Sequence, residues 1–492
     1  MKILLVYPEF PDTFWSFKHA LKFLQKKAGA PPLGLLTVAA MLPSEWEKRL
    51  VDLNVTELKE KDLKWADFVF LSAMTIQRES VEAVIKRCKN AGAKIVAGGP
   101  LFTMEHELFP DVDHFVLNEA EETLAPFLLD LELGHLKRVY SSKKYPDIHK
   151  TPAPLWELAD PKFYETASIQ FSRGCPFSCD FCNVTALLGH YPRTKTAPQI
   201  IAELDRLYAL GWRKSIFFVD DNFIGNKKHI KENVLPAMIE WRKGKPGMPF
   251  STEVSINLAD DPVLLDLMVE AGFDTVFVGI ETPNEESLTE CSKSQNKGRD
   301  LVESVKKLQR AGLQVQGGFI VGFDNDSPSI FQQQIDFIQK SGIVTAMVGL
   351  LQAPLGTHLY DRMKKEKRLA RNFSGDNADG STNIIPKMGL EPLRAGYRKI
   401  LSQIYDPKLY YARVFTFLRE YKPPKVTVAF EPQYILAFWR SIYQLGIRGV
   451  ERAQYWRLFF WTLFRHPRLF PLAITFTIMG FHFRQVAELH VI

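Results

Sequence analysis

The sequence predicts an α/β protein in three parts: a doubly wound parallel sheet, a partial barrel of six β/α units, and a mainly helical C-terminal region. Three observations predict this architecture. In residues 1–135, short and nearly continuous apolar runs alternate with helical patterns, which is typical of buried parallel strands. A second alternating series with longer spacing occupies residues 166–360, and the alternation then stops. The proline-rich residues 136–165 are predicted to link the first two parts.

The first part has five strand candidates. They are KILLVYP (2–8), KRLVDL (48–53), DFVFLSAM (67–74), AKIVAGGP (93–100) and HFVLN (114–118). Between them lie helical patterns, one of which ends at Gly92, as helices often end at glycine. Doubly wound sheets bind ligands beyond the carboxyl ends of their strands, so this edge is the candidate binding edge. A dinucleotide is disfavoured, because this part lacks the G-x-G-x-x-G fingerprint.

The second part has six strand candidates. They are SIQFS (168–172), SIFFVD (215–220), FSTEVS (250–255), TVFVGIE (275–281), QVQGGFIVG (314–322) and TAMVGLLQ (345–352). Helical patterns separate these strands, and the first of them is predicted to open with a capping box at Thr196 to Gln199. Six units are fewer than the eight of a closed barrel. Chemistry in such barrels takes place at the carboxyl ends of the strands.

The third part, residues 361–492, begins with a charged, loop-like stretch and continues as helices rich in arginine and aromatic residues. RAQYWRLFFWTLFRHPRLF (452–470) holds seven aromatics and four arginines in nineteen residues. The longest uncharged run, Leu469 to Phe481, has 13 residues, whereas a bilayer span needs about 20, so no transmembrane helix is predicted. Two interpretations remain: these helices pack on the barrel, or part of them lies against a membrane or covers a lipophilic substrate.

Composition excludes several classes of protein. The 492 residues are 46% hydrophobic and 24% charged, with a net charge of +6 and intermixed signs, which argues against a nucleic-acid binder. Five cysteines are too few and too scattered for a secreted disulfide framework. The start, MKILLVYPEF, fits a buried strand better than a signal peptide. A reducing cytoplasm is therefore expected.

Three of the five cysteines, Cys175, Cys179 and Cys182, lie within eight residues directly after the first barrel strand. They could be isolated structural thiols. They could hold a structural zinc with His190 as fourth ligand, although the C-x3-C-x2-C spacing lacks the paired knuckles of zinc ribbons. They could instead hold an iron–sulfur cubane in which one iron keeps an open position, as catalytic metal sites require.

C-x3-C-x-aromatic-C, with Phe181 as the aromatic residue, after the first strand of a six-unit barrel resembles the radical S-adenosylmethionine (radical SAM) superfamily. The resemblance implies a [4Fe-4S] cluster whose open iron chelates the amino and carboxylate groups of SAM. Reductive cleavage of SAM then yields a 5′-deoxyadenosyl radical. It also implies an electron donor such as flavodoxin or ferredoxin.

The same resemblance implies a set of SAM-binding residues. They are Phe181, Asp220, Asp221, Asn222, Glu253, Glu281, Gly318 and Gly322. Glu253 fits the acidic residue that reaches the SAM ribose. Val219 to Phe223 departs from the usual Gly-Gly-Glu-like segment, so Asp220 and Asp221 could instead cap a helix or bind loop amides. The two glycines could likewise only relieve crowding.

A doubly wound domain before such a barrel resembles the cobalamin-binding class of radical SAM enzymes, whose N-terminal domain is Rossmann-like. PPLGLLTVAAMLP, VDLNV and VAGGP match that class in order and placement. The implied cobalamin-binding residues are Tyr7, Pro8, Gly34, Asp52, Ser72, Met74, Gly98, Gly99, Asn118 and Glu119. Asp52 to Glu57 lacks the histidine of D-x-H-x-x-G, so the lower cobalt face would have no imidazole ligand. The alternative is a domain that has lost cobalamin and serves as a scaffold.

The resemblance predicts a cobalamin-dependent radical SAM methyltransferase acting on an unactivated carbon of a lipophilic metabolite, such as a hopanoid, an isoprenoid lipid or a tetrapyrrole. It would be cytoplasmic, with peripheral membrane contact if the C-terminal helices provide it. One alternative is a radical SAM enzyme for ring formation, coupling or oxidation that binds cobalamin without transferring a methyl group. The other is a non-catalytic iron–sulfur or cobalamin sensor. No general base is predicted, because the first step removes a hydrogen atom.

Overall fold

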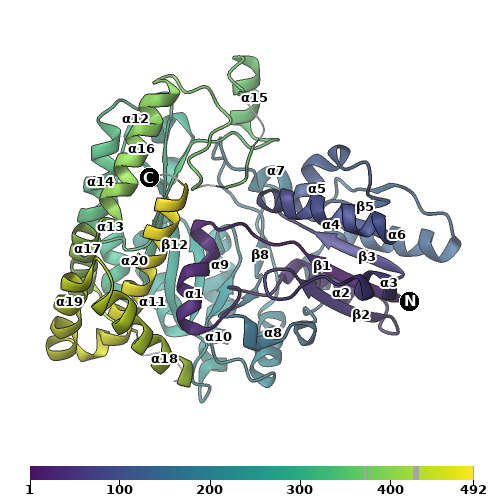
Figure 1. Ribbon diagram of the computed structural model, residues 1–492, viewed down its shortest axis with the longest axis horizontal. Helices are drawn as coiled ribbons and strands as arrows, with labels where there is room; N and C mark the ends of the chain where they lie inside the picture. The colour runs from purple at the N-terminus through teal and green to yellow at the C-terminus, as the bar shows by residue number, and fades with distance from the viewer. Residues whose placement is uncertain (371–372, 377, 425–430, 491–492) are drawn as a thin grey trace.

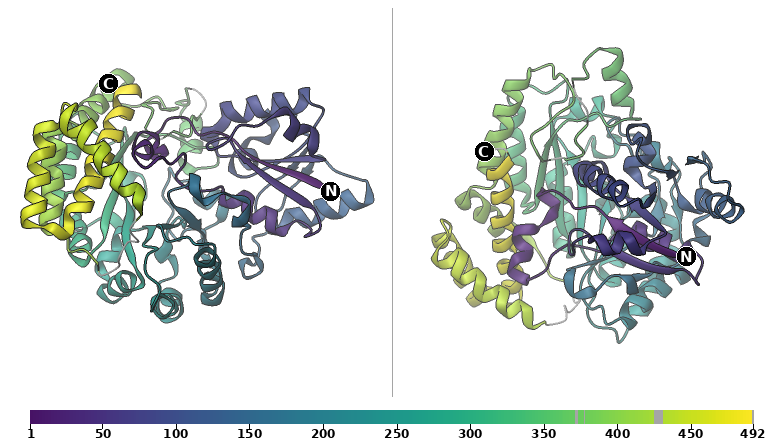
Figure 2. Two further views of the ribbon diagram at one scale, coloured as in Figure 1. Left: turned by 60° about the horizontal axis from the view of Figure 1, so that its bottom comes forward. Right: turned by 45° about the vertical axis from the view of Figure 1, so that its right-hand side comes forward.

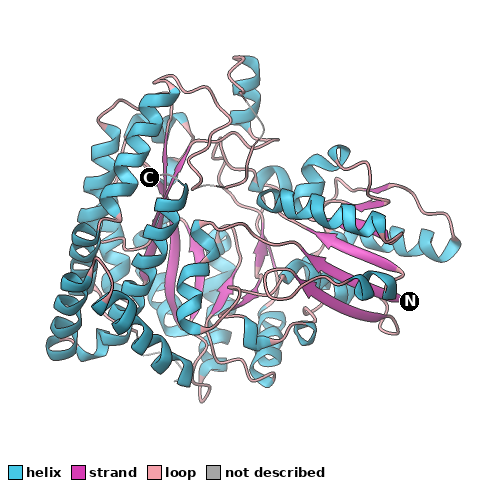
Figure 3. Ribbon diagram, in the orientation of Figure 1, coloured by secondary structure: helices cyan, strands magenta, loops and turns pink. Residues whose placement is uncertain are grey.

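The computed structural model describes residues 1–370, 373–376, 378–424 and 431–490. In Figure 1 the N-terminal sheet lies on the right, the second sheet in the middle, and the last helices on the left. Figure 3 shows the strands gathered in these two sheets, with helices around them. The predicted α/β architecture is confirmed.

The N-terminal sheet has six parallel strands in the order β2-β1-β3-β4-β5-β6. They are β1 (Lys2–Tyr7), β2 (Glu47–Asp52), β3 (Phe68–Ser72), β4 (Lys94–Gly98), β5 (His114–Val116) and β6 (Val139–Tyr140). The accompanying helices are α2 (Leu33–Met41), α3 (Glu60–Trp65), α4 (Arg78–Asn90), α5 (Pro100–Glu105) and α6 (Ala120–Leu133). Alternate β1 residues join two separate apolar clusters, so both faces of the sheet are buried.

The sequence pattern does not reveal β6. Its two residues lie within the stretch predicted as a linker, and they pair with the end of β5. A two-residue strand is too short to show an apolar run, and its position follows from backbone bonds such as the one that the Leu117 amide donates to the Tyr140 carbonyl, 2.9 Å long.

The second sheet is an open barrel of six parallel strands in chain order, β7-β10-β11-β12-β13-β14. They are β7 (Ala167–Ile169), β10 (Ile216–Phe218), β11 (Phe250–Val254), β12 (Phe273–Glu281), β13 (Gln314–Val321) and β14 (Ala346–Leu350). The covering helices are α8 (Ala197–Ala209), α10 (Leu235–Arg242), α11 (Pro262–Ala271), α13 (Leu301–Ala311) and α14 (Ile330–Ser341). The predicted capping box opens α8: the Gln199 side chain accepts from the Thr196 amide at 2.9 Å.

The predicted strand 168–172 is divided in two. β7 ends at Ile169, and the chain then forms β8 (Ser172–Arg173), which pairs antiparallel with β9 (Arg193–Thr194). This two-stranded ribbon closes the loop of residues 174–192, which carries the three cysteines. Residues 174–192 are called the cluster loop below.

The C-terminal region is helical, as predicted. It contains α15 (His358–Lys365), α16 (Leu390–Ile404), α17 (Pro407–Glu420), α18 (Pro432–Ser441), α19 (Arg452–Arg465) and α20 (Phe470–His490). The short N-terminal helix α1 (Lys18–Leu24) packs against α18 and α20. The left view of Figure 2 shows the last helices, in yellow, at the end of the molecule opposite the N-terminal sheet. Within the described residues, no helix combines the length and apolarity that crossing a membrane requires.

Candidate active site at the barrel mouth

The cluster loop follows directly on the first barrel strand. Its fold is fixed by backbone bonds: the Cys175 amide donates to the Gly189 carbonyl (3.2 Å), and the Cys182 amide donates to the Cys179 carbonyl (3.1 Å). Gly174 has φ +94°, and a Cβ there would lie 2.8 Å from the Tyr191 carbonyl oxygen, so only glycine fits at the start of the loop.

All three cysteines are free thiols and partly exposed. Burial raises the pKa of Cys175 and Cys179 above the usual range and that of Cys182 to about 12. Because thiolates are the ligands of iron, loading a cluster here releases three protons. In the described part of the chain, no three His, Cys, Asp or Glu side chains converge around a position for a single metal ion. His190 lies 3.4 Å from the Ser178 hydroxyl through Nδ1.

A lysine lies close to the three cysteines. The Lys293 ammonium donates to the Glu281 carboxylate at 2.7 Å. Its positive charge partly offsets the rise that burial causes in the pKa of each thiol. The side-chain amide of Gln295 donates to Cys179 Sγ at 3.9 Å, and its buried Oε1 has no partner among the described protein atoms. Both side chains come from the segment between α12 (Glu285–Glu290) and α13.

Two of the predicted SAM-binding acids have different environments. Asp220 accepts from the Phe171 amide (3.1 Å), the Ser172 amide and the Ser172 hydroxyl (2.5 Å), so its carboxylate is held by the strand that leads into the cluster loop. Asp221 contacts the Gly174 amide, and burial raises its pKa to about 6. Asp220 therefore positions the loop, whereas Asp221 lies next to the cysteines.

Glu253 faces the interior of the barrel. Its neighbour Val254 belongs to the core packed under the helices, so the alternation of the strand directs Glu253 inward. Its register partner on β12 is Phe277, which shares that inner face. Burial, together with the nearby Asp221 charge, raises the pKa of Glu253 to about 8.

The remaining predicted SAM contacts are partly accounted for by packing. Glu281 adopts φ +64° at the end of β12 and pairs with Lys293. A Cβ on Gly318 would lie 2.7 Å from the Phe277 ring, so the missing side chain makes room for that ring. Gly322, at φ +107°, donates its amide to Asp326 at 2.8 Å.

Two further predicted SAM contacts also have protein partners. Asn222 accepts from the Ser255 amide at 3.2 Å. The Phe181 ring lies against Phe323 and 6.0 Å from the Lys293 ammonium.

Several predicted cobalamin-binding residues meet at the carboxyl edge of the N-terminal sheet. Tyr7 is level with Asp52, and Ser72 is level with Gly98. A Cβ on Gly99, at φ +88°, would lie 2.5 Å from the Ser72 hydroxyl. Gly34 near the start of α2 has open space above it, and Met74 is half exposed. The strand ends at this edge thus carry glycines without side chains, and open space lies beside Gly34.

The position of the missing histidine is occupied by Asn54, whose side chain is fully engaged. Its Oδ1 accepts from the Phe10 amide (2.9 Å), and its Nδ2 donates to the Pro8 carbonyl (3.2 Å) and to Asp52 (2.7 Å). The other oxygen of Asp52 accepts from the Tyr164 hydroxyl at 3.0 Å. These bonds hold the loop after β1 in place and occupy the side chain of Asn54.

Glu119 joins the N-terminal domain to the β8-β9 ribbon. It accepts from Arg173 on β8 (2.6 Å) and from Arg193 on β9 (2.8 Å), while Arg173 also donates to Glu121 (2.9 Å). All four side chains are at most 15% exposed. Burial would raise the pKa of Glu121, but Arg173 outweighs it and holds the value below the usual range. This group, the interdomain clamp, fixes both strands of the ribbon to the N-terminal domain. Asn118 beside it has φ +64° and donates its amide to Thr103.

Sequence reasoning missed Arg173, Arg193, Lys293 and Gln295. Arg173 stands two residues before Cys175, and this was the only local signal. Its partner Glu119 lies 54 residues away, and no pattern in the chain connects the two.

Comparison with known proteins agrees with this arrangement. The chain matches the B12-binding domain over residues 27–128, the radical SAM superfamily over 169–338, and a domain of unknown function (DUF4070) over 357–491. The fold and the cysteine loop thus define a radical SAM enzyme with a cobalamin domain.

Relatives refine this class. An uncharacterized methyltransferase of Synechocystis sp. is 39% identical over 99% of this chain and 92% of its own. The hopanoid C-2 methylase of Rhodopseudomonas palustris is 33% identical over 93% and 88%. The bacteriochlorophyllide d C-12(1)-methyltransferase of Chlorobaculum tepidum is 26% identical over 76% and 82%. The chain belongs to the cobalamin-binding radical SAM methyltransferase family, and its cofactors are SAM, a [4Fe-4S] cluster and cobalamin.

Two solved structures share the fold. The cobalamin-dependent radical SAM enzyme OxsB with aqua-cobalamin bound has a TM-score of 0.61 at 14% identity and covers 99% of this chain and 80% of its own. The radical SAM methyltransferase TsrM from Kitasatospora setae has a TM-score of 0.59 at 15% identity over 99% of both chains. At these identities the likeness shows the architecture.

Proposed function

We propose that the enzyme methylates an unactivated carbon of a lipophilic metabolite of the hopanoid, isoprenoid or tetrapyrrole class. The names of the relatives support this substrate class, since two of them act on a hopanoid and a bacteriochlorophyllide. The observation that carries the proposal is an apolar wall inside the barrel next to Glu253.

Trp15 forms the centre of this wall. Its ring lies 5.5 Å from the Phe277 ring in an edge-on arrangement, and its indole N–H donates to Met347 Sδ at 2.9 Å. Trp15 is nevertheless 37% exposed, an unusual exposure for a side chain so placed. Phe277 is the register partner of Glu253, so the wall lies beside the carboxylate that we assign to the SAM ribose.

The C-terminal helices hold Trp15 in place. The preceding ring, Phe14, stacks on Phe483 of α20 at 4.3 Å, and His482 Nε2 lies 3.0 Å from the Phe14 carbonyl oxygen. The segment that carries Trp15 leaves the carboxyl edge of the N-terminal sheet at Tyr7. One short stretch therefore connects the proposed cobalamin edge, the proposed substrate wall and the C-terminal region.

We assign Cys175, Cys179 and Cys182 to the cluster, Glu253 and Asp221 to SAM, and the edge marked by Tyr7, Ser72, Gly98 and Gly99 to cobalamin. When bound, the three cofactors supply a carbon-centred radical that removes a substrate hydrogen atom, and a methyl group that replaces it. The protein contributes position: the interdomain clamp fixes the cluster loop against the N-terminal domain, and the apolar wall orients a substrate that has few polar groups.

We propose further that the enzyme contacts the membrane surface through α18, α19 and the segment between them, which begins with the π-helix Ile442–Ile447. Residues 432–470 contain six arginines and a single acid, Glu451, whose side chain is 1% exposed and paired with Arg484. Exposed apolar residues recur every fourth position, as Ile435, Trp439, Tyr443 and Ile447, and Phe460 stacks on the 75% exposed Phe464. Exposed aromatics with arginines favour an anionic bilayer surface.

Lipid profiling of a deletion strain tests the substrate class. We expect one methylated lipophilic product to disappear and its form with one methyl group fewer to accumulate, and both to revert on complementation. Loss of a methylated polar metabolite with an unchanged lipid profile would overturn the proposal.

Vesicle sedimentation tests the membrane contact. We expect binding to vesicles containing phosphatidylglycerol, weaker binding to pure phosphatidylcholine, and loss of binding in Trp439→Ala/Phe464→Ala. Leu108→Ala, which removes a 60% exposed leucine from the N-terminal domain, is the matched control and should bind as the wild type does. Equal binding by both variants would exclude this surface.

A further inference from the structure

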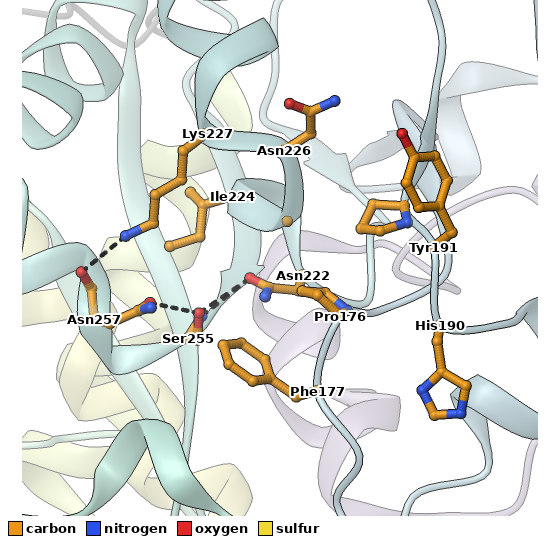
Figure 4. A pocket seen from close by; sticks show the side chains of 12 residues that line it. Pro176, Phe177, His190, Tyr191, Asn222, Ile224, Asn226, Lys227, Ser255 and Asn257 are labelled. Atoms are coloured by element: carbon orange, nitrogen blue, oxygen red, sulfur yellow. Dashed lines mark hydrogen bonds between the residues drawn. The ribbon is translucent and has the colours of Figure 1, made fainter.

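A depression beside the cluster loop shares one residue with the predicted SAM contacts, Asn222, whose side-chain oxygen already accepts from the Ser255 amide. None of its other lining residues is assigned to a cofactor above. It has a volume of about 490 Å³ and lies between the cluster loop and the loops that follow β10 and β11. Figure 4 shows its floor, where Asn222, Ser255, Asn257 and Lys227 form a chain of hydrogen bonds, and its rim, which includes Phe177 and Tyr191.

The depression is connected to Cys175, a proposed cluster ligand, through Phe177, which lines it. The Phe177 amide donates to the Cys175 thiol, and the Phe177 ring points toward Ser255 on the floor (Figure 4). Pro176 and Ser178 on either side of it are exposed. The outer surface of the loop around Cys175 is therefore open to a protein partner.

The other half of the cluster loop is covered by protein. The Asp180 amide donates to the Cys291 carbonyl (3.1 Å), and the Asp180 carbonyl accepts from the Leu359 amide on α15 (2.9 Å). Phe181 packs against a cluster of buried apolar residues that includes Leu359 and Met363. A partner can therefore approach the cluster more closely from the Cys175 side than through this half of the loop.

The charge of the depression selects the kind of partner. None of the described residues that line it is acidic. The Lys227 ammonium donates to the neutral Asn257 carbonyl at 3.3 Å, and the next residue, Lys228, is exposed. Tyr191, 78% exposed, adds a ring that can cover a flat surface of a partner. Such a surface complements a protein with an acidic face and an apolar patch at its centre.

We propose that this depression is the docking site of the one-electron donor, an acidic protein of the flavodoxin or ferredoxin class. In the encounter the donor is oxidised by one electron, the [4Fe-4S] cluster is reduced by one electron, and no bond forms or breaks. A small, shallow contact suits this role, because electron-transfer encounters are weak and bury little surface. The inference depends on the cluster and is independent of the proposed substrate class and membrane contact.

Anaerobic stopped-flow reduction of the cluster tests the site in the full-length, cluster-loaded enzyme. Bleaching of the cluster absorbance is followed with reduced flavodoxin and, separately, with dithionite, a small reductant that needs no docking site. At low ionic strength Lys228→Glu should slow reduction by flavodoxin about tenfold, and Tyr191→Ala should slow it less. Reduction by dithionite should be unchanged in both variants. Lys307→Glu, at an exposed lysine on α13, is the matched control and should behave as the wild type does.

Four results would overturn the proposal. Lys228→Glu and Lys307→Glu could slow reduction by flavodoxin equally, which would indicate a general charge effect. Neither variant could change the rate of reduction by flavodoxin, which would place docking elsewhere. The two reductants could be slowed alike, or SAM affinity could fall, which would assign the depression to the cluster or to another ligand.

Discussion

Removing Glu119 should loosen the ribbon that closes the cluster loop. In Glu119→Ala, Arg173 keeps Glu121. Arg193 loses its carboxylate and keeps the carbonyls of Leu188 and Pro146, at 3.1 and 3.3 Å, and the Tyr145 ring at 4.8 Å. Breaking a buried ion pair by deleting one partner costs about 3–5 kcal/mol, because the other charge stays buried. Since one arginine retains a carboxylate, we expect the lower end, about 3 kcal/mol.

Hydrogen exchange measures this effect locally. A loss of about 3 kcal/mol corresponds to roughly hundredfold faster exchange of the ribbon amides, such as those of Ser172, Cys175 and Lys195. Glu119→Gln keeps one acceptor oxygen and should show a smaller change. Glu240→Ala removes an exposed partner of Lys243 and should change nothing measurable. Unchanged exchange of the ribbon in Glu119→Ala would refute the assignment of the clamp.

Three further predictions concern the cluster, the substrate wall and a buried histidine. Cys179→Ala should abolish 5′-deoxyadenosine formation, whereas Cys88→Ala, at a buried thiol of the N-terminal domain, should retain it when the product is measured by chromatography. Trp15→Ala should lower the yield of methylated product per 5′-deoxyadenosine several-fold, with Trp15→Phe in between; an unchanged ratio would exclude Trp15 from the wall. Burial lowers the pKa of His482 to about 4, against about 6.5 when unfolded, so the unfolded state binds the extra proton and stability should rise between pH 4 and 6.5. His482→Gln should remove about 3 kcal/mol of that rise, measured by urea unfolding at several pH values, and an identical slope would contradict the buried neutral histidine.

Local patterns were enough to predict the parts of the site that depend on neighbouring residues. The spacing of Cys175, Cys179 and Cys182 predicted their common loop, because three thiols within eight residues lie on one short segment of the chain. The strands followed from apolar runs, and Glu253 was assigned from the resemblance of its strand, FSTEVS, to a segment of the family. In each case the determining interactions lie within one element.

Long-range contacts could not be predicted in this way. Glu119 was expected at cobalamin, and the structure shows its carboxylate bound by two arginines from another domain. Trp15 reaches the barrel because helices from the opposite end of the chain hold Phe14, 468 residues from His482. Asp220 is similar: its sequence position suits a SAM contact, yet backbone amides 48 and 49 residues away take its oxygens. Which partner a carboxylate meets is decided by packing, and no pattern in the sequence records it.

The most direct test of the central claim is an anaerobic turnover with SAM, reductant and a lipid extract from the parent organism. Both S-adenosylhomocysteine and 5′-deoxyadenosine should accumulate, together with a methylated lipid that carries label from methyl-labelled SAM. Formation of 5′-deoxyadenosine without S-adenosylhomocysteine or labelled lipid would contradict the assignment as a cobalamin-dependent methyltransferase.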